Sequence, residues 1–248
     1  MGKTSLTPAS PPVEALPDAD ALAHRVADWM LEIALNASGP IAIALAGGST
    51  PRATYQLMAS PQYRDKFPWQ RIHWFWGDER FVPLDNPRSN YHMAWQALLS
   101  RAPVPAGNIH AVPVAESTPD HAANAYEQTL KSFYGSERLD PARPLFNINL
   151  LGLGEDGHLA SLFPRTTALQ EKERWVTSVA GPQPEPRITL TFPALESSRH
   201  AAFLVAGVDK ASILARLRAR DPALPASHFE PIGALHIFAE LAAASRLS

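Results

Sequence analysis

IAIALAGGSTPRATYQLM, residues 41–58, is the stretch that decides the fold. It opens with five apolar residues, Ile41 to Leu45, a length that suits a buried strand. A glycine-rich turn follows, and Pro51 then stands in the first turn of a helix, where proline is tolerated best. The stretch therefore predicts a strand, a tight turn and a helix in direct succession.

The same alternation continues on both sides of this unit. Apolar residues at helical spacing between 21 and 36, with Asp18 or Asp20 as the cap, predict a helix before it. Strands that alternate with helices imply an α/β fold, with a mainly parallel sheet and helices on both faces. We predict further strands at 72–76, 145–151, 188–192 and 201–205, and further helices at 91–99, 122–133, 209–220 and 235–246.

Length, charge and composition narrow the classes of function. The chain has 248 residues, of which 46% are hydrophobic, and this is ample for a core. A net charge of -2 gives no basic field for nucleic acid, and no apolar run approaches the length of a membrane span. Without cysteine there is no disulfide scaffold or thiolate metal site, and a reducing cytoplasm suits the chain. We interpret the proline-rich residues 1–20 as a flexible arm and 21–248 as a single domain.

Three of the predicted strands end in polar loops that are rich in glycine. Ligands of parallel sheets bind outside the carboxyl ends of the strands, so these loops should meet. The first loop, 47–50, allows close approach of a ligand to its backbone and leads into a helix N-terminus, so it suits an anion. An ordinary tight turn is the alternative, because the loop matches neither the dinucleotide pattern nor the Walker pattern.

The second loop, 77–80, places three charged residues directly after an aromatic strand. A surface ion pair is one explanation, although such a pair contributes little. The other is that Arg80 binds a phosphate or a developing oxyanion through two parallel hydrogen bonds, and we favour this interpretation.

The third loop, 152–158, reads GLGEDGH and holds the strongest candidate for catalysis. Asp156 and His158 flank a glycine, so both side chains can face the same space. A carboxylate beside an imidazole fixes its tautomer and raises its basicity, and a general base is built in this way. The alternative is a lone histidine that caps the next helix. Neither a metal-ligand cluster nor a nucleophile-elbow context for Ser161 is present in the sequence, so we expect no metal and no cofactor.

Two more basic residues stand near strand ends. Arg187 follows the stiff proline-rich loop 181–186, and Lys210 begins a helix after Gly207. Each alone is typical of a solvated surface charge. Together with the first loop they would form a phosphate pocket.

Five segments of the chain resemble the 6-phosphogluconolactonase family, and they occur in family order. The resemblance implies a modified Rossmann-like α/β sandwich, shared with glucosamine-6-phosphate deaminase. It also implies hydrolysis of 6-phospho-D-glucono-1,5-lactone in the oxidative pentose phosphate pathway. The segments are ALAGGSTPRATYQLMA (44–59), HWFWGDERFVPLDNPRSNYHMA (73–94), LLGLGEDGHLASLFP (150–164), PRITLTFPAL (186–195) and GVDKA (207–211).

The resemblance also assigns roles to residues. It makes His158 the general base and Asp156 its supporting carboxylate, and it places Arg80 with Asp78 along the active site. Three positions depart from the family's usual residues: Asn147 and Ala239 stand where acids are common, and Gln183 stands where a lysine is common. The substrate's phosphate would be held by Gly47, Gly48, Ser49, Thr50, Arg187 and Lys210.

Two other functions remain open at this point. An enzyme of the glucosamine-6-phosphate deaminase or isomerase type would, by resemblance, carry another acid soon after the DGH motif, but residues 159–164 read LASLFP. A non-catalytic sugar-phosphate sensor would need a partner or DNA-binding segment, and no appended module is apparent. We expect a cytoplasmic monomer whose partner is a small phosphorylated lactone, with no nucleic acid and no membrane.

Overall fold

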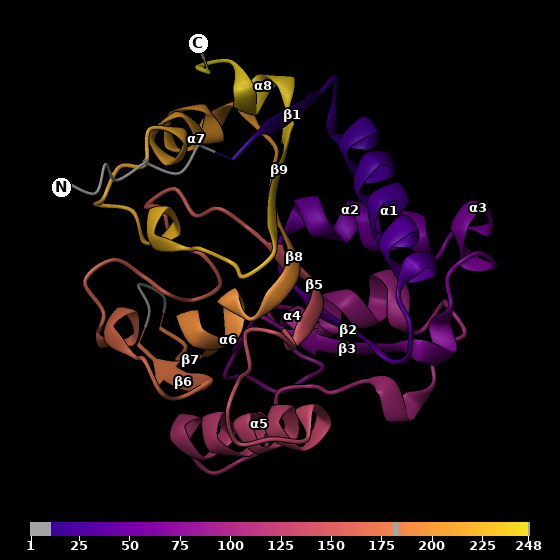
Figure 1. Cartoon of the computed structure of the whole chain (residues 1–248), viewed down its shortest axis with the longest axis vertical. Helices are drawn as coiled ribbons and strands as arrows, with labels where there is room; N and C mark the ends of the chain where they lie inside the picture. The colour runs from indigo at the N-terminus through magenta and orange to yellow at the C-terminus, as the bar shows by residue number, and fades with distance from the viewer. Residues whose placement is uncertain (1–10, 181–183, 248) are drawn as a thin grey trace, which may run out of the picture.

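The computed structural model describes residues 11–180 and 184–247, and a sheet of six strands forms its centre (Figure 1). The strands lie in the order β1-β9-β8-β5-β2-β3, and every pairing is parallel. The predicted α/β class is thereby confirmed. The strands are β1 (Val13–Leu16), β2 (Ile41–Leu45), β3 (Ile72–Trp76), β5 (Phe146–Leu151), β8 (Ser198–Val205) and β9 (Ala234–Glu240).

Strand β2 lies between β3 and β5 and is buried along its whole length. Its residue Ile43 lies opposite Trp74 on one side and Ile148 on the other. A parallel strand covered on both faces needs apolar residues throughout, as this one has. The departure at Asn147 has a structural role here, because its side-chain oxygen accepts a hydrogen bond of 2.9 Å from the backbone N–H of Ala42.

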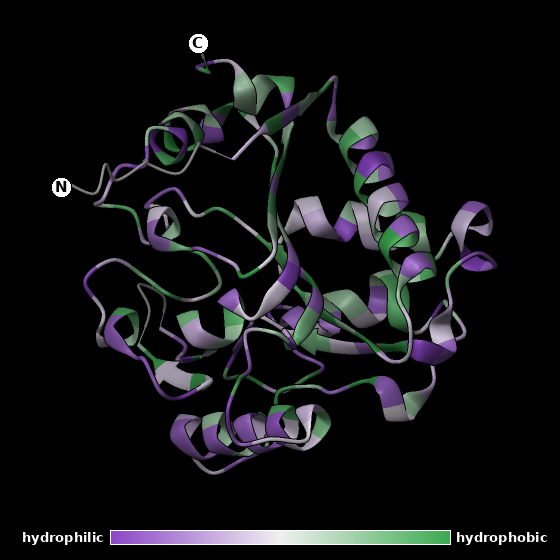
Figure 2. Cartoon of the chain, in the orientation of Figure 1, coloured by the Kyte–Doolittle hydropathy of each residue, from purple (hydrophilic) through white to green (hydrophobic). Residues whose placement is uncertain are grey.

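Helices cover both faces of the central sheet: α1 and α2 lie on one side, and α7 lies on the other (Figure 1). Helix α1 begins after Asp18, whose carboxylate accepts a hydrogen bond of 2.8 Å from Ala21 N–H, so Asp18 is the cap. Hydrophobic and hydrophilic stripes alternate along α1 and α5 (Figure 2). The helices are α1 (Ala19–Asn36), α2 (Ser49–Met58), α3 (Pro61–Arg64), α4 (Asn90–Ala94), α5 (Pro119–Tyr134), α6 (Phe192–Glu196), α7 (Ala211–Arg218) and α8 (Leu241–Ala244), with a π-helical turn at Trp95–Leu99 and 3₁₀ turns at Trp69–Arg71, Ala106–Asn108, Thr167–Gln170, Val208–Lys210 and Pro225–His228.

A smaller antiparallel sheet lies beside the main one, in the order β4-β7-β6. Its strands are β4 (Asp78–Arg80), β6 (Val176–Val179) and β7 (Arg187–Leu190). The strand predicted at 188–192 is therefore real but belongs to this second sheet. Its pairing with β4 brings Arg187 opposite Arg80, and this register matters for the site.

The helix predicted at 235–246 is wrong over most of its length. Residues 234–240 form β9, which pairs with β1 and β8, and only Leu241–Ala244 is helical. The alanine-rich composition favours a helix locally, but the sheet offers this segment two partners, and tertiary pairing overrides propensity. Ala239 is completely buried in this strand, where an acid would lack water.

The flexible arm predicted for residues 1–20 is also wrong at its C-terminal end. Val13–Leu16 pairs with β9 as the edge strand β1, and α1 already begins at Ala19. Residues 1–10 of the predicted arm lie outside the described residues. Across residues 11–180 and 184–247, no helix is both long and apolar enough to span a membrane.

Candidate active site

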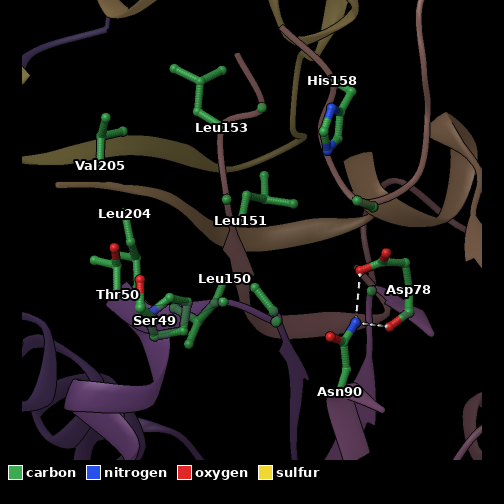
Figure 3. A pocket seen from close by; sticks show the side chains of 18 of the residues that line it. Ser49, Thr50, Asp78, Asn90, Leu150, Leu151, Leu153, His158, Leu204 and Val205 are labelled. Atoms are coloured by element: carbon green, nitrogen blue, oxygen red, sulfur yellow. Dashed lines mark hydrogen bonds between the residues drawn. The ribbon is translucent and has the colours of Figure 1, made fainter. Parts of the chain in front are cut away.

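A cavity of about 570 Å³ opens at the carboxyl ends of β2, β3, β5 and β8. The chain reverses into a loop at each of these ends, and parallel strands place all such loops at one edge. Ser49 and Thr50 lie on one side of the cavity, with His158, Asp78 and Asn90 on the other (Figure 3). All ten candidates from the sequence line this cavity: Gly47, Gly48, Ser49, Thr50, Asp78, Arg80, Asp156, His158, Arg187 and Lys210.

The first loop connects β2 to α2. Gly48 has a φ of +104°, a conformation that residues with a side chain rarely adopt, and α2 begins at the next residue. The loop is held from behind by Tyr55, whose hydroxyl accepts from Ala46 N–H and donates to Ala46 C=O, both at 3.0 Å. The first turn of α2, which carries free N–H groups, therefore lines the cavity.

Asp78 ties the second loop to the segment after the third loop and to α4. Its Oδ2 accepts a hydrogen bond of 2.6 Å from Ser161 Oγ, on the third loop's side of the cavity. Asn90 Nδ2 donates to the backbone oxygen of Asp78 at 2.8 Å and lies 3.4 Å from its Oδ1 (Figure 3). A β-carbon on Gly47 would lie 2.0 Å from Asn90 Oδ1, so this glycine allows the first loop to approach the start of α4.

Glu79 is a buried carboxylate, only 1% exposed, directly behind the cavity wall. Its oxygens accept hydrogen bonds from the N–H groups of Asn90 at 2.8 Å and Tyr91 at 2.7 Å, and from Ser89 Oγ at 2.9 Å. Burial raises the pKa of Glu79, and these donors oppose the rise. The carboxylate thus caps the start of α4 and fixes Asn90 at the rim of the cavity.

Two arginines lie side by side where β4 and β7 pair. Arg187 is 7% exposed, and among the residues described here its guanidinium has no ion-pair partner and its Nε no hydrogen bond. Burial lowers the pKa of Arg187, and the adjacent charge of Arg80 lowers it further. Arginine nevertheless stays protonated in proteins. A buried cation without a partner is costly, so this position is suited to receive an anion.

In the third loop, His158 and Asp156 form a pair. His158 Nδ1 lies 2.6 Å from Asp156 Oδ1. Burial alone would raise the pKa of Asp156, but hydrogen bonds from the His158 ring and backbone outweigh it, and the net shift is downward. An ionised carboxylate can only accept, so the ring carries its proton on Nδ1 and leaves the Nε2 lone pair free. Gly154 makes room for the ring, since a β-carbon there would come within 2.0 Å of Nδ1.

Lys210 reaches the cavity from the turn after β8. Its Nζ lies 4.0 Å from Glu155 Oε1, a carboxylate whose side chain is 78% exposed and therefore a weak partner. The turn is fixed by Gly207, whose N–H donates to Glu240 Oε2 at 2.8 Å. The ammonium group of Lys210 is therefore available to a ligand in the cavity.

Comparison with known proteins agrees with this geometry. A sequence model of the family described as glucosamine-6-phosphate isomerases/6-phosphogluconolactonase matches residues 17–237. A 6-phosphogluconolactonase of Nostoc sp. is 42% identical over 243 residues, which cover 95% of this chain and 98% of the relative. The chain belongs to the 6-phosphogluconolactonase family.

Solved structures place the same chain in the same fold. The 6-phosphogluconolactonase from Thermotoga maritima superposes on it with a TM-score of 0.77 at 32% identity, covering 92% of this chain and 98% of that one. A protein named devB superposes with a TM-score of 0.86 at 31% identity, covering 95% and 99%. The modified Rossmann-like sandwich implied by the resemblance is therefore confirmed.

Reasoning from the sequence did not predict the roles of three residues of this 6-phosphogluconolactonase-family site. Asn90 lines the cavity, while Ser161 and Glu79 hold the residues that do. The sequence held a signal for Glu79. An acid at the end of a buried strand needs either water or hydrogen-bond donors, so a structural role could have been predicted for its carboxylate. Asn90 and Ser161 gave no such signal, since their partners lie 12 and 83 positions away. The departure at Gln183 lies outside the described residues.

Proposed function

We propose that this chain hydrolyses 6-phospho-D-glucono-1,5-lactone to 6-phospho-D-gluconate, with His158 as the general base. The observation that carries the proposal is the 2.6 Å pairing of His158 with Asp156 in the same cavity as Arg187, a buried cation with no ion-pair partner among the residues that the structure describes. Such a cavity offers both a base for water and an anchor for phosphate. Membership of the lactonase family supports the lactone as the bond that is broken.

The first step is attack of water on the lactone carbonyl. The free Nε2 of His158 takes one proton from water while the water oxygen forms a bond to C1. Asp156 accepts from Nδ1–H throughout, so the imidazolium that forms has a carboxylate beside it. A positioned base of this kind accelerates a reaction by about 10²–10⁴-fold.

The second step is collapse of the tetrahedral oxyanion. Arg80 and backbone N–H groups would stabilise the negative oxygen, a contribution of ~3 kcal/mol per well-placed donor. The C1–O5 bond then breaks, and O5 takes the proton from Nε2 and becomes a hydroxyl. The new carboxylic acid loses a proton to solvent. Asp78, held by Ser161 and Asn90, is placed to accept a hydrogen bond from a sugar hydroxyl.

The phosphate would bind between the first loop and the two cations. The first turn of α2 presents free N–H groups, the positive end of a dipole and the hydroxyls of Ser49 and Thr50. Arg187 supplies a buried guanidinium, and Lys210 supplies an ammonium group. This anchor would orient the lactone rather than take part in bond breaking.

An assay of both family reactions tests the proposal. The lactone is generated in situ, and acid release is followed with and without the protein after subtraction of spontaneous hydrolysis. Ammonia release from glucosamine 6-phosphate is measured in parallel. We expect rapid acid release and no ammonia, because residues 159–164 supply no further acid after the DGH motif. Ammonia release without lactone hydrolysis would favour the deaminase instead, and phosphosugar binding without turnover of either substrate would favour a sensor.

A further inference from the structure

A second cavity of about 560 Å³ lies between α2 and the helical segment that runs from α4 through its π-helical turn. It shares no lining residue with the candidate active site, although both cavities use the same two helices. Ser49, Thr50 and Asn90, at the starts of α2 and α4, line the first cavity, whereas Arg52, Gln56 and His92 of the same helices line the second. Its walls are built mainly from Arg52, Gln56, His92, Trp95, Gln96 and Arg101.

The lining of this cavity is basic and includes no acidic residue. Arg52 comes from α2, whereas His92 comes from α4 and Arg101 follows the π-helical turn. Across residues 11–180 and 184–247, the guanidinium groups of both arginines lack an ion pair or a hydrogen bond. The whole chain has a net charge of -2, so this patch does not reflect a generally basic surface. Unneutralised cations from two elements that line the same cleft favour a bound anion.

The same cavity holds a tryptophan that is exposed. Trp95 is 41% exposed, whereas the other five tryptophans of the chain are at most 5% exposed. One face of its ring lies on Tyr91, with centroids 6.0 Å apart and planes within 16°. Trp95 also begins the π-helical turn, whose bond runs from Ser100 N–H to Trp95 C=O at 3.1 Å. Such turns are rare in proteins, and those that occur are often found at functional sites.

We propose that this cavity binds a nucleoside phosphate, with the base stacked on Trp95 and the phosphates held by Arg52 and Arg101. A flat aromatic base matches the exposed indole, which its contact with Tyr91 holds in place. A phosphate chain matches two guanidinium groups, each of which can form forked hydrogen bonds. Gln56 and Gln96 supply amide groups that can donate to and accept from the edge of a base. Neither a simple anion nor a neutral ring would use both halves of this lining.

Titration of the full chain with ATP tests the proposal. Divalent metal is chelated, and saturating 6-phosphogluconate occupies the candidate active site. Binding is followed by calorimetry and by quenching of tryptophan fluorescence, which reports chiefly on the exposed Trp95. We expect ATP to bind at least tenfold more tightly than adenosine alone or tripolyphosphate alone, because each of these engages only half of the cavity.

Substitutions separate the two halves of the cavity. Arg52→Gln and Arg101→Gln should each weaken ATP binding by roughly tenfold, as expected for loss of one charge-assisted contact. Trp95→Leu should abolish the quenching and weaken ATP while leaving tripolyphosphate unchanged. The matched control is Arg138→Gln, which removes an exposed arginine that does not line this cavity and should leave ATP binding unaltered.

Three results would overturn the proposal. Tripolyphosphate that binds as tightly as ATP would reduce the cavity to an adventitious anion site. ATP that competes with 6-phosphogluconate would place the nucleotide in the lactone cavity instead. Binding that is unaffected by both arginine substitutions would place it elsewhere on the surface. Failure of the lactonase assay would leave each of these readouts intact, apart from the competition arm.

Discussion

Arg187 is a buried cation that a bound phosphate would stabilise. It is buried without a partner among the described residues, and Lys210 has only an exposed carboxylate nearby. If they read the phosphate, Arg187→Ala and Lys210→Ala should each raise KM for the phosphorylated lactone by roughly 10- to 100-fold, since a charge-assisted hydrogen bond contributes ~1.5–3 kcal/mol. Steady-state kinetics measure this directly. The Tm of Arg187→Ala should not fall, because the substitution removes an unpaired buried charge.

Unphosphorylated gluconolactone is the control for this prediction. It should be a poor substrate of the wild type, and neither substitution should make it much worse. Equal losses of activity on the phosphorylated and unphosphorylated lactones would show that these cations do not bind the phosphate. Arg80 would then be the remaining candidate for the phosphate contact.

Gly154 contributes to the site by lacking a side chain. A β-carbon at this position would come within 2.0 Å of His158 Nδ1 and would push the ring away from Asp156. We expect Gly154→Ala to lower kcat by at least tenfold with a smaller change in KM, because the base is misplaced while the phosphate anchor is intact. Gly107→Ala, with nothing within 4 Å of the added carbon, should behave as wild type in the same assay. Normal kcat in Gly154→Ala would mean that the observed ring position is not the catalytic one.

At the scale of elements, the packing of β3 against the Ala106–Asn108 turn creates a site sensitive to pH. His110 Nε2 lies 3.0 Å from His73 Nδ1, and its ring stacks on Phe75 at 4.5 Å, with Phe133 also in contact. Burial, together with the neighbouring charge of His73, lowers the pKa of His110 from 6.5 to about 4. The unfolded chain therefore binds a proton at a higher pH than the folded chain does.

The sign of this effect follows from linkage. The stability contributed by neutral His110 is present above about pH 6.5, the value in an unfolded chain, and is lost as pH falls toward 4. We expect the free energy of unfolding to drop over this window by on the order of 1 kcal/mol from this residue, after allowance for solvent screening of a half-exposed ring. Denaturant melts at pH 7 and pH 5 should show a smaller drop in His110→Phe than in wild type. An identical drop in both proteins would contradict the assignment.

The elements also show where sequence patterns are informative and where they are not. The strand at 72–76 is found at its predicted bounds, because an apolar run closed by a polar glycine loop has few alternative structures. The segment 235–246 was predicted to be helical, and its alanines favour a helix, but pairing with β1 on one side and β8 on the other makes residues 234–240 a strand. Strand β7 was found, but its membership of a second sheet depends on β4, a three-residue strand too short to give a periodic signal.

For the molecule as a whole, the convergence of the candidate residues was predictable, but their contacts were not. Parallel topology alone brings Thr50, Asp78 and His158 to one edge of the sheet, so the cavity follows from the order of strands and loops. The hydrogen bond from Ser161 to Asp78 joins residues far apart in sequence and depends on side-chain packing. The sequence therefore predicted which residues meet, whereas the hydrogen bonds that hold them in place depend on how the side chains pack.

The reaction as proposed uses no metal. Across residues 11–180 and 184–247, no group of three or more His, Asp or Glu side chains is arranged to hold an ion. The proposed chemistry uses an imidazole base and guanidinium or backbone donors instead. We expect kcat to survive exhaustive dialysis against EDTA. Loss of activity that a single divalent ion restores would replace His158 with a metal-bound water as the source of the nucleophile.

The most direct test of the central claim is the turnover of His158→Ala with 6-phospho-D-glucono-1,5-lactone, measured beside its affinity for the product 6-phosphogluconate. His158 is the only histidine that lines the described cavity, and its free Nε2 is the proposed acceptor of the water proton. We predict a fall in kcat of about 10²–10⁴-fold, the contribution of a general base. Product affinity should remain within about threefold of wild type, since the phosphate anchor is untouched. Turnover close to that of the wild-type protein would contradict the assignment of His158 as the general base.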